Sequence, residues 1–184
     1  MMTDRDIQAA REDLAAAFRW SARLNMHEAV SNHFSFAIND AGTKFLVNPA
    51  GIHFSRVKAS DLVIVDLDEP LPTPEAGGPD PTAAAIHGAM HRTTPQPRCV
   101  IHLHPKYVTA LSTLDDPTIR PIDQNTARFY NRVSYDLGFG GMGLGDEAER
   151  LSSTLGNRSV VLMGAHGAMT VGTRVCDAFD DFYY

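Results

Sequence analysis

Apolar residues recur along this chain at two spacings, one typical of helices and one typical of strands. Near the amino end, Ile7, Leu14 and Phe18 fall on one helical face, and Thr3 supplies a hydroxyl that can cap the first turn. Other segments carry short apolar runs or alternate apolar with polar residues, as strands do. We expect helices over residues 3–24, 82–93, 106–112, 121–130, 147–155 and 174–184. We expect strands over residues 34–38, 44–47, 62–67, 98–104, 159–164 and 168–172.

The order of these elements predicts one sheet covered by helices. Residues 39–42 contain Asn, Asp and Gly between the first two strands, which predicts a hairpin. Residues 62–67 are too apolar to present a face to solvent, so we expect this strand at the centre of the sheet. The length of 184 residues suits a single domain over 1–184. The last predicted helix has no capping residue before Tyr184, so we expect the sequence to end inside that element.

The composition excludes several classes of protein. No apolar run approaches the roughly 20 residues that a membrane span needs, and residues 1–10 lack the apolar core of a secretory signal, so we expect a cytoplasmic protein and no membrane partner. The formal net charge of −6 has the wrong sign for binding a phosphate backbone, so nucleic acid is not an expected partner. Cys99 and Cys176 stand in apolar surroundings without a C-x-x-C pair, which predicts buried thiols.

Histidine is the residue type that points to chemistry. His102 and His104 flank Leu103 at the end of a predicted strand, and residues two apart share a face, so both imidazoles can converge on one divalent ion. His166, between small residues in a turn, is the candidate third ligand. Three imidazoles leave a coordination position open, as catalytic metal sites do. On spacing alone, the alternative is that the H-x-H pair only satisfies hydrogen bonds near a strand end.

Further histidines have less decisive surroundings. His87 and His91 lie four residues apart and share a helix face, but no Glu stands between them, so the zinc-protease pattern is absent. We consider a site role for His87 and a structural or surface role for His91. His33 follows Asn32 in a polar stretch, which fits either the lining of a pocket or a capping turn.

Two other kinds of site can be set aside. Residues 138–145 are rich in glycine, but no Lys-Ser or Lys-Thr pair follows them, so a turn or loop is expected there rather than a phosphate-binding P-loop. The sequence contains no G-x-S-x-G elbow and no cysteine beside a plausible base, so a hydrolase with a Ser or Cys nucleophile has little support.

Four short motifs, in order along nearly the whole chain, resemble those of the class II aldolase/adducin family. They are Asn48-Pro-Ala-Gly51, Ser60-Asp-Leu-Val63, His102-Leu-His-Pro105 and Ala165-His-Gly167. The resemblance implies an α/β fold, a three-layer α/β/α domain with a mostly antiparallel central sheet. It implies a homotetramer whose active site lies at a subunit boundary. It also implies one divalent metal ion at His102, His104 and His166, with Zn²⁺ expected and Mn²⁺ or Fe²⁺ as alternatives.

The resemblance also indicates where this sequence departs from the family's sugar-phosphate aldolases. Those enzymes carry a proton-transferring Glu on the helix before the metal strand, and the matching position here is Ala83. Where phosphate-binding members carry a Ser pair and a Thr, this chain has Pro81, Thr82 and Ala50. The expected phosphate cradle is therefore incomplete. The candidate substrate-binding residues are Asn32, Gly51 and Thr82.

Asp80 to His87, Gln124-Asn125 and Arg128-Phe-Tyr130 instead resemble the adducin-like bacterial branch, some of whose relatives are regarded as decarboxylases. Loss of CO₂ next to a carbonyl generates the same carbanion as retro-aldol cleavage, and a divalent ion stabilises it without a base to start the reaction. A proton donor is still required. The candidate catalytic residues are His87, Tyr130 and His33.

The sequence therefore predicts a divalent-metal-dependent lyase. We expect it to cleave a carbon–carbon bond, by aldol cleavage or decarboxylation, in a small hydroxy-carbonyl or carboxylate substrate. Two alternatives stay open, a non-catalytic interaction domain like that of adducin and a sugar-phosphate epimerase. The expected partners are the small-molecule substrate and further copies of the chain.

Overall fold

The computed structural model describes residues 2–93, 98–138 and 146–184, so most of the glycine-rich segment, residues 139–145, lies outside the described part. The strands are β1 (His33–Ala37), β2 (Lys44–Val47), β3 (Val63–Asp66), β4 (Cys99–Leu103), β5 (Val133–Asp136), β6 (Val160–Met163) and β7 (Gly167–Gly172). The α-helices are α1 (Asp4–Arg23), α2 (Pro81–Thr93), α3 (Lys106–Ser112), α4 (Gln124–Ala127), α5 (Glu147–Leu155) and α6 (Val175–Tyr183). Short 3₁₀ turns occupy Phe54–Arg56, Ala59–Asp61 and Pro74–Ala76.

The seven strands form one sheet in the order β3-β2-β1-β4-β7-β6-β5. Every neighbouring pair is antiparallel except β5 and β6, which run parallel. This arrangement confirms the expected α/β fold with a mostly antiparallel central sheet. It also puts β4 in the middle of the sheet, between β1 and β7.

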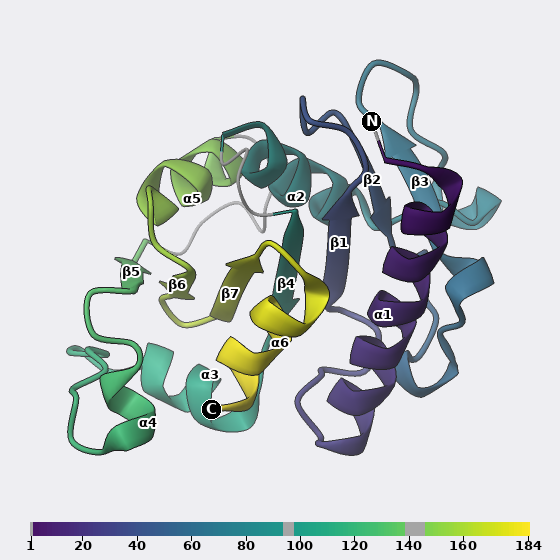
Figure 1. The fold of residues 1–184 in the computed structure, drawn as a ribbon. Helices are drawn as coiled ribbons and strands as arrows, with labels where there is room; N and C mark the ends of the chain where they lie inside the picture. The colour runs from purple at the N-terminus through teal and green to yellow at the C-terminus, as the bar shows by residue number, and fades with distance from the viewer. Residues whose placement is uncertain (1, 94–97, 139–145) are drawn as a thin grey trace.

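Helices cover both faces of the sheet and make the expected three layers. On one face, Phe34 and Ile101 belong to the apolar cluster that includes residues of α1 and α6. On the other face, Val100 and Met169 pack with residues of α2 and α5. The switch between neighbours such as Val100 and Ile101 follows from the alternation of side chains along a strand. Figure 1 shows the two helix pairs, α1 with α6 and α2 with α5. In the described part of the chain, no helix combines the length and apolar character that crossing a membrane requires.

The structure corrects several expectations about local elements. The strand expected at the centre of the sheet, β3, is an edge strand that pairs with β2 alone, and its Ile64 is 46% exposed. An apolar run satisfies an edge strand equally well when one of its faces packs on the core. The helix expected over residues 121–130 is limited to α4, and β5 was not predicted because Val133-Ser-Tyr-Asp136 has little apolar character. Cys99 is buried as expected, whereas the prediction for Cys176 is wrong because this thiol is exposed.

The predicted hairpin between β1 and β2 is confirmed, and its turn touches α2. Gly42 adopts a positive φ of 68°, a conformation that glycine reaches without strain. A Cβ atom on Gly42 would lie 2.2 Å from the backbone oxygen of His91. The hairpin turn therefore packs directly against the carboxyl end of α2, which carries two of the histidines discussed below.

Candidate metal centre

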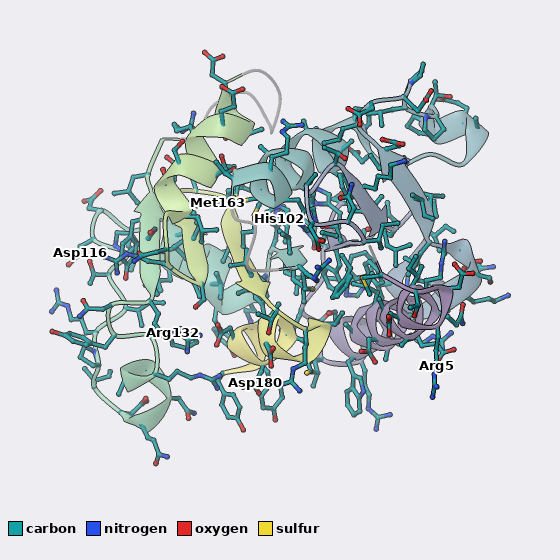
Figure 2. The ribbon with its side chains drawn as sticks, turned by 45° about the horizontal axis from the view of Figure 1, so that its top comes forward. Arg5, His102, Asp116, Arg132, Met163 and Asp180 are labelled. Carbon is teal, nitrogen blue, oxygen red and sulfur yellow. The ribbon has the colours of Figure 1, made fainter. Side chains whose placement is uncertain are left out.

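His102 and His104 come from β4 and the residue just beyond its end. Because they stand two positions apart, both side chains project from the face that α2 and α5 cover, while Leu103 is fully buried on the opposite face. Figure 2 shows His102 towards the centre of the ribbon, whereas Arg5 and Asp116 lie at its periphery. The middle of the sheet thus supplies two imidazoles from one short stretch of backbone.

The tight turn between β6 and β7 supplies His166. Ala165 just before it has a positive φ of 51°, which is uncommon for a residue with a side chain and indicates a constrained turn. At Gly167, an added Cβ would lie 2.6 Å from the backbone oxygen of Leu103 and 2.7 Å from Cδ2 of His104. The missing side chain at Gly167 therefore lets this turn approach the end of β4 and brings His166 against His104.

The three imidazoles meet at one point. The Nε2 atoms of His102 and His104 lie 2.9 Å apart. The ring centre of His166 lies 5.0 Å from that of His102 and 4.6 Å from that of His104. One nitrogen from each residue can be chosen so that all three lie within 4.8 Å of one another. Two separate segments of the chain therefore bring together the nitrogen set that the sequence predicts as metal ligands.

Contacts on the outer side of two of these rings orient them. The Nδ1–H of His102 donates to the backbone oxygen of Ala168 at 3.0 Å, and Nδ1 of His104 lies 2.5 Å from Oε2 of Glu28. A proton held on Nδ1 by such a partner leaves the lone pair of Nε2 for a metal, which is the usual outer contact of metal-binding histidine. The donor set and its outer contacts fit a divalent ion. Glu28 was not predicted, because it lies in a loop far from the H-x-H motif in sequence.

The surroundings of His102 and His166 favour the neutral form of both imidazoles. Burial lowers the pKa of His102 well below its ordinary value, and the neighbouring His33, His104 and His166 lower it further. Burial also lowers the pKa of His166, although Glu147 and Glu28 act in the opposite direction. A neutral imidazole is the form that binds a metal ion. His102 and His166 are therefore in the form that accepts a cation at neutral pH.

A second group of polar side chains lies beside the first and is buried with it. His33 is paired with His102 across β1 and β4, and their ring centres lie 5.0 Å apart. Nδ1 of His33 lies 2.7 Å from Nε2 of His87 on α2. The hydroxyl of Ser35 is hydrogen-bonded to Nδ1 of His87 and lies 2.7 Å from Nε2 of His91. We call His33, His87, Ser35 and His91 the buried histidine chain.

The buried histidine chain changes the roles that the sequence suggested for His87 and His91. Both ring nitrogens of His87 are occupied by His33 and Ser35, so His87 reaches the metal cluster only through His33. Burial lowers the pKa of His87 well below its ordinary value, and lowers that of His91 to about 3. Burial likewise lowers the pKa of His33 to about 4, against the opposing effect of Asp80. Ser35 was missed, although its position two residues after His33 puts it on the same strand face.

The predicted substrate-binding residues lie near the amino ends of β1 and α2 or in a neighbouring turn. Asn32 is buried, and its Oδ1 accepts a hydrogen bond from the backbone of Glu28 at 2.8 Å. Thr82 lies in the first turn of α2 and donates its hydroxyl proton to Asp80 at 2.6 Å. Gly51 is exposed in a turn with a positive φ of 77°. Asn32 is therefore hydrogen-bonded to Glu28, and Thr82 to Asp80. Glu28 and Asp80 are carboxylates whose charges act on His166 and His33, respectively.

Tyr130 stands apart from the other predicted site residues. Its side chain is 66% exposed and lines a surface cavity of about 340 Å³ together with Arg120 and Arg158. Among the described residues that line this cavity, none is a histidine. A single chain therefore does not bring Tyr130 to the metal cluster.

Comparisons with known proteins agree with this architecture. A family model described as the class II aldolase and adducin N-terminal domain matches residues 12–184. The crystal structure of an aldolase II superfamily protein from Pseudomonas syringae superposes with a TM-score of 0.87, at 32% identity over 99% of this chain and 75% of that chain. An L-fuculose 1-phosphate aldolase from Glaciozyma antarctica gives a TM-score of 0.81, at 25% identity over 97% of this chain and 69% of that chain.

A curated relative has a different named activity. The chain is 31% identical over 143 residues to a 3-oxo-tetronate 4-phosphate decarboxylase from Haemophilus influenzae, which covers 75% of this chain and 66% of that protein. The chain spans 64% to 68% of the length of the first curated relatives that it matches.

Proposed function

Because this chain belongs to the class II aldolase and adducin family, we propose that it is a lyase that uses one divalent metal ion to cleave a carbon–carbon bond. The observation that supports this proposal is the convergence of His102, His104 and His166, whose ligand nitrogens lie within 4.8 Å of one another. The expected substrate is a small hydroxy-carbonyl or carboxylate compound. Zn²⁺ is the proposed metal, since three imidazoles suit it, and Mn²⁺ and Fe²⁺ are the alternatives.

Each residue of the cluster has a distinct part in this proposal. His102, His104 and His166 would hold the ion, and Ala168 and Glu28 keep the first two rings turned towards it. When bound, the ion would polarise a substrate oxygen and stabilise the negative charge that develops as the carbon–carbon bond breaks. Asn32, Gly51 and Thr82 are the proposed substrate contacts.

Decarboxylation is the reaction that these residues favour over aldol cleavage. Retro-aldol cleavage starts with removal of a hydroxyl proton, and the position where the resemblance expects the proton-transferring Glu is Ala83. Ala83 is 1% exposed and packs against Phe45 and Val47, so α2 offers no carboxylate there. Loss of CO₂ starts without a base and needs only delivery of a proton afterwards. The named activity of the Haemophilus influenzae relative supports the same choice.

The candidates for proton delivery differ in their access to the cluster. Only His33 lies against a metal histidine, whereas His87 lies behind it. Tyr130 is exposed, so it would reach the cluster of a neighbouring copy rather than its own. The proposal therefore includes a homotetramer in which Tyr130 contributes across a subunit boundary. A cytoplasmic location stays a prediction of the sequence.

The test of the proposed function is turnover by metal-loaded protein. Purified protein would be stripped of metal, reloaded with Zn²⁺, Mn²⁺ or Fe²⁺, and assayed for CO₂ release from a panel of small 3-oxo acids and for aldehyde release from hydroxy-carbonyl compounds. We expect metal-dependent CO₂ release that disappears in His102→Ala. Failure to bind any of the three ions would contradict the proposal and favour an adducin-like interaction domain, whereas isomer interconversion without cleavage would favour an epimerase.

A further inference from the structure

The buried histidine chain has a preferred direction of hydrogen bonding that determines which form of His33 faces the metal cluster. We propose that the buried histidine chain holds His33 as a neutral hydrogen-bond donor, whose Nε2–H is offered to an anionic oxygen of the metal-bound ligand. In this assignment, His87, Ser35 and His91 are positioning residues. The inference rests on the proposed function, which supplies the ligand.

The geometry leaves one ring nitrogen of His33 available to a ligand. Nδ1 of His33 lies 2.7 Å from His87, so Nε2 is on the ring edge that faces away from α2's histidine. His33 is 4% exposed, and His102 lies opposite it on β4, with ring centres 5.0 Å apart. The hydrogen bond of His33 to another described side chain uses Nδ1, and none of the hydrogen bonds between described residues involves Nε2. That atom is therefore the one that a ligand at the cluster can meet.

Burial favours the neutral form of every imidazole in the buried histidine chain. Ser35 and His87 are 0% exposed and His91 is 2% exposed, so a charged imidazole there would lose its hydration without gaining a carboxylate partner. A neutral imidazole carries one N–H and one lone pair, and a hydroxyl donates one hydrogen bond. Among the described residues, the Ser35 hydroxyl is hydrogen-bonded only to His87 and His91, so it donates to one ring and accepts from the other. All three links therefore run in the same direction.

In the first of the two directions, protons lie towards the metal cluster. Nε2–H of His91 donates to Ser35, the Ser35 hydroxyl donates to Nδ1 of His87, and Nε2–H of His87 donates to Nδ1 of His33. His33 then carries its own proton on Nε2. The atom at the far end is Nδ1 of His91, which is buried and has no hydrogen-bond partner among the described residues. In this direction that nitrogen holds only a lone pair.

The opposite direction of hydrogen bonding is less favourable at Nδ1 of His91. It would place a proton on Nδ1 of His91 and leave a buried N–H with no acceptor. Buried N–H groups without a partner are rarer than buried acceptors that are incompletely satisfied, because a buried donor that makes no hydrogen bond loses the one it made to water. The His91 ring lies beside the apolar ring of Phe45, with ring centres 5.1 Å apart, and Phe45 has no oxygen or nitrogen in its side chain that could accept the proton. The first direction is therefore preferred.

A fixed N–H on His33 defines the kind of ligand atom that suits this position. An N–H group stabilises an oxygen that carries negative charge, such as a carboxylate oxygen or the oxygen of an enolate. Loss of the whole proton would leave a buried imidazolate. Resupply through His87 would end at His91, whose Nδ1 has no hydrogen-bond partner in the part of the chain that the structure describes. His33 therefore contributes a hydrogen bond to the ligand, and the proton that replaces CO₂ comes from another group or from water.

Nitrogen NMR of the zinc-loaded protein tests the assignment without any need for turnover. Protein labelled with ¹⁵N in histidine gives distinct signals for protonated and bare ring nitrogens. We expect His33 to carry its proton on Nε2 and to have a bare Nδ1, with a bare Nδ1 in His91 as well. A proton on Nδ1 of His33, or a mixture of both forms, would overturn the proposal. This measurement on the unaltered protein decides the question even where a variant does not fold.

A matched pair of variants at His87 tests the positioning role. His87→Gln keeps an N–H donor for His33, whereas His87→Met fills a similar volume without one. Glycolate, a small hydroxy acid, serves as the probe, and calorimetry measures its affinity for the zinc-loaded proteins. We expect affinity within about twofold of the unaltered protein for His87→Gln and a loss of about tenfold for His87→Met, with a mixture of His33 forms in the NMR spectrum of the latter.

The two proposals fail in distinguishable ways. Equal glycolate affinity for His87→Met and the unaltered protein would overturn the positioning role of the buried histidine chain. A protein that shows the expected NMR signals and glycolate affinities, but cleaves no substrate with any metal, would contradict the proposed function and leave the assignment of His33 intact.

Discussion

His33 on β1 and His102 on β4 are direct cross-strand partners, and their imidazole centres lie 5.0 Å apart. This pairing joins two histidine groups that the chain assembles from distant segments. On one side, His102 belongs to the cluster with His104 and His166. On the other side, His33 is the end of the buried histidine chain. The pairing of β1 with β4 therefore connects the candidate metal centre to the buried face of α2.

Removing one ligand should strongly weaken metal binding at the cluster. In His166→Ala, two imidazoles remain, and we expect affinity for Zn²⁺ to fall by at least about 100-fold because a structural donor is lost outright. Metal analysis after equilibrium dialysis measures this. His53→Ala is the matched control, since His53 belongs to an exposed pair with His27. Equal loss in both variants would indicate that the cluster is not the binding site.

The carboxylate behind His104 should tune metal affinity rather than determine it. Glu28 lies 2.5 Å from Nδ1 of His104. In Glu28→Gln the charge is removed while the size is kept, and we expect Zn²⁺ affinity to fall by about 10- to 100-fold. Competition with a fluorescent chelator gives the affinity. Glu12→Gln on the exposed side of α1 should leave it unchanged, and unchanged affinity in Glu28→Gln would contradict the orienting role.

Gly167 should be sensitive to the smallest addition. A Cβ there would lie 2.6 Å from the backbone of Leu103 and 2.7 Å from His104, so the turn that carries His166 must shift. We expect Gly167→Ala to lower the free energy of unfolding by about 1–3 kcal/mol and to weaken Zn²⁺ binding. Urea denaturation and metal analysis measure the two effects. Gly77→Ala has open space around its Cβ, so its effect should be limited to backbone strain and should spare metal binding.

The stability of the metal-free protein should fall as the pH is lowered below the ordinary pKa of histidine. Burial lowers the pKa of His91 to about 3 in the folded state, whereas an unfolded chain has a value of about 6.5. Between these two values the unfolded state binds more protons, so the free energy of unfolding rises with pH and is lost as pH falls from about 6.5 towards 3. One such group contributes at most about 1.4 kcal/mol per pH unit.

Urea denaturation at pH 7.5 and pH 5 checks this sign. His91→Gln removes the titrating group and should show a smaller difference in the free energy of unfolding between the two pH values. A difference as large as in the unaltered protein would assign the pH dependence to other residues.

Mixed oligomers should reveal whether Tyr130 acts across a subunit boundary. We expect Tyr130→Phe and His102→Ala to be inactive when each is assayed alone. Unfolding and refolding the two variants together should restore part of the activity, because one chain then supplies the tyrosine and another the metal cluster. Activity of Tyr130→Phe alone at the unaltered level would remove this residue from the proposed reaction.

Local patterns predicted the parts of this molecule that depend on neighbours in sequence. The H-x-H spacing put His102 and His104 on one strand face, and the small residues around His166 indicated a turn that approaches them closely. The buried histidine chain was not predicted, because it depends on the register of β1 against β4 and on how α2 docks over both strands. Ser35 carries no local signal that distinguishes it from a serine with an ordinary structural role.

The misjudged elements have the same origin. The apolar run of β3 does not reveal how many strands pair with it, and only the sheet order makes it an edge. The exposed thiol of Cys176 lies in an amphipathic helix whose orientation is determined by packing on β4 and β7 rather than by adjacent residues. Pairing and docking decide such cases, and both act between segments that are remote in sequence.

The contact between Gly42 and the backbone of His91 makes the β1–β2 hairpin sensitive to added atoms in its turn. Surface turns are where protein engineers usually insert tags or lengthen a connection, because such changes are normally harmless. Here the turn abuts the end of α2 with room for nothing larger than a hydrogen atom. An insertion at Gly42 would push on the helix that carries His87 and His91. This loop is therefore a poor place to insert a tag, and substitutions in it should disturb the buried histidine chain.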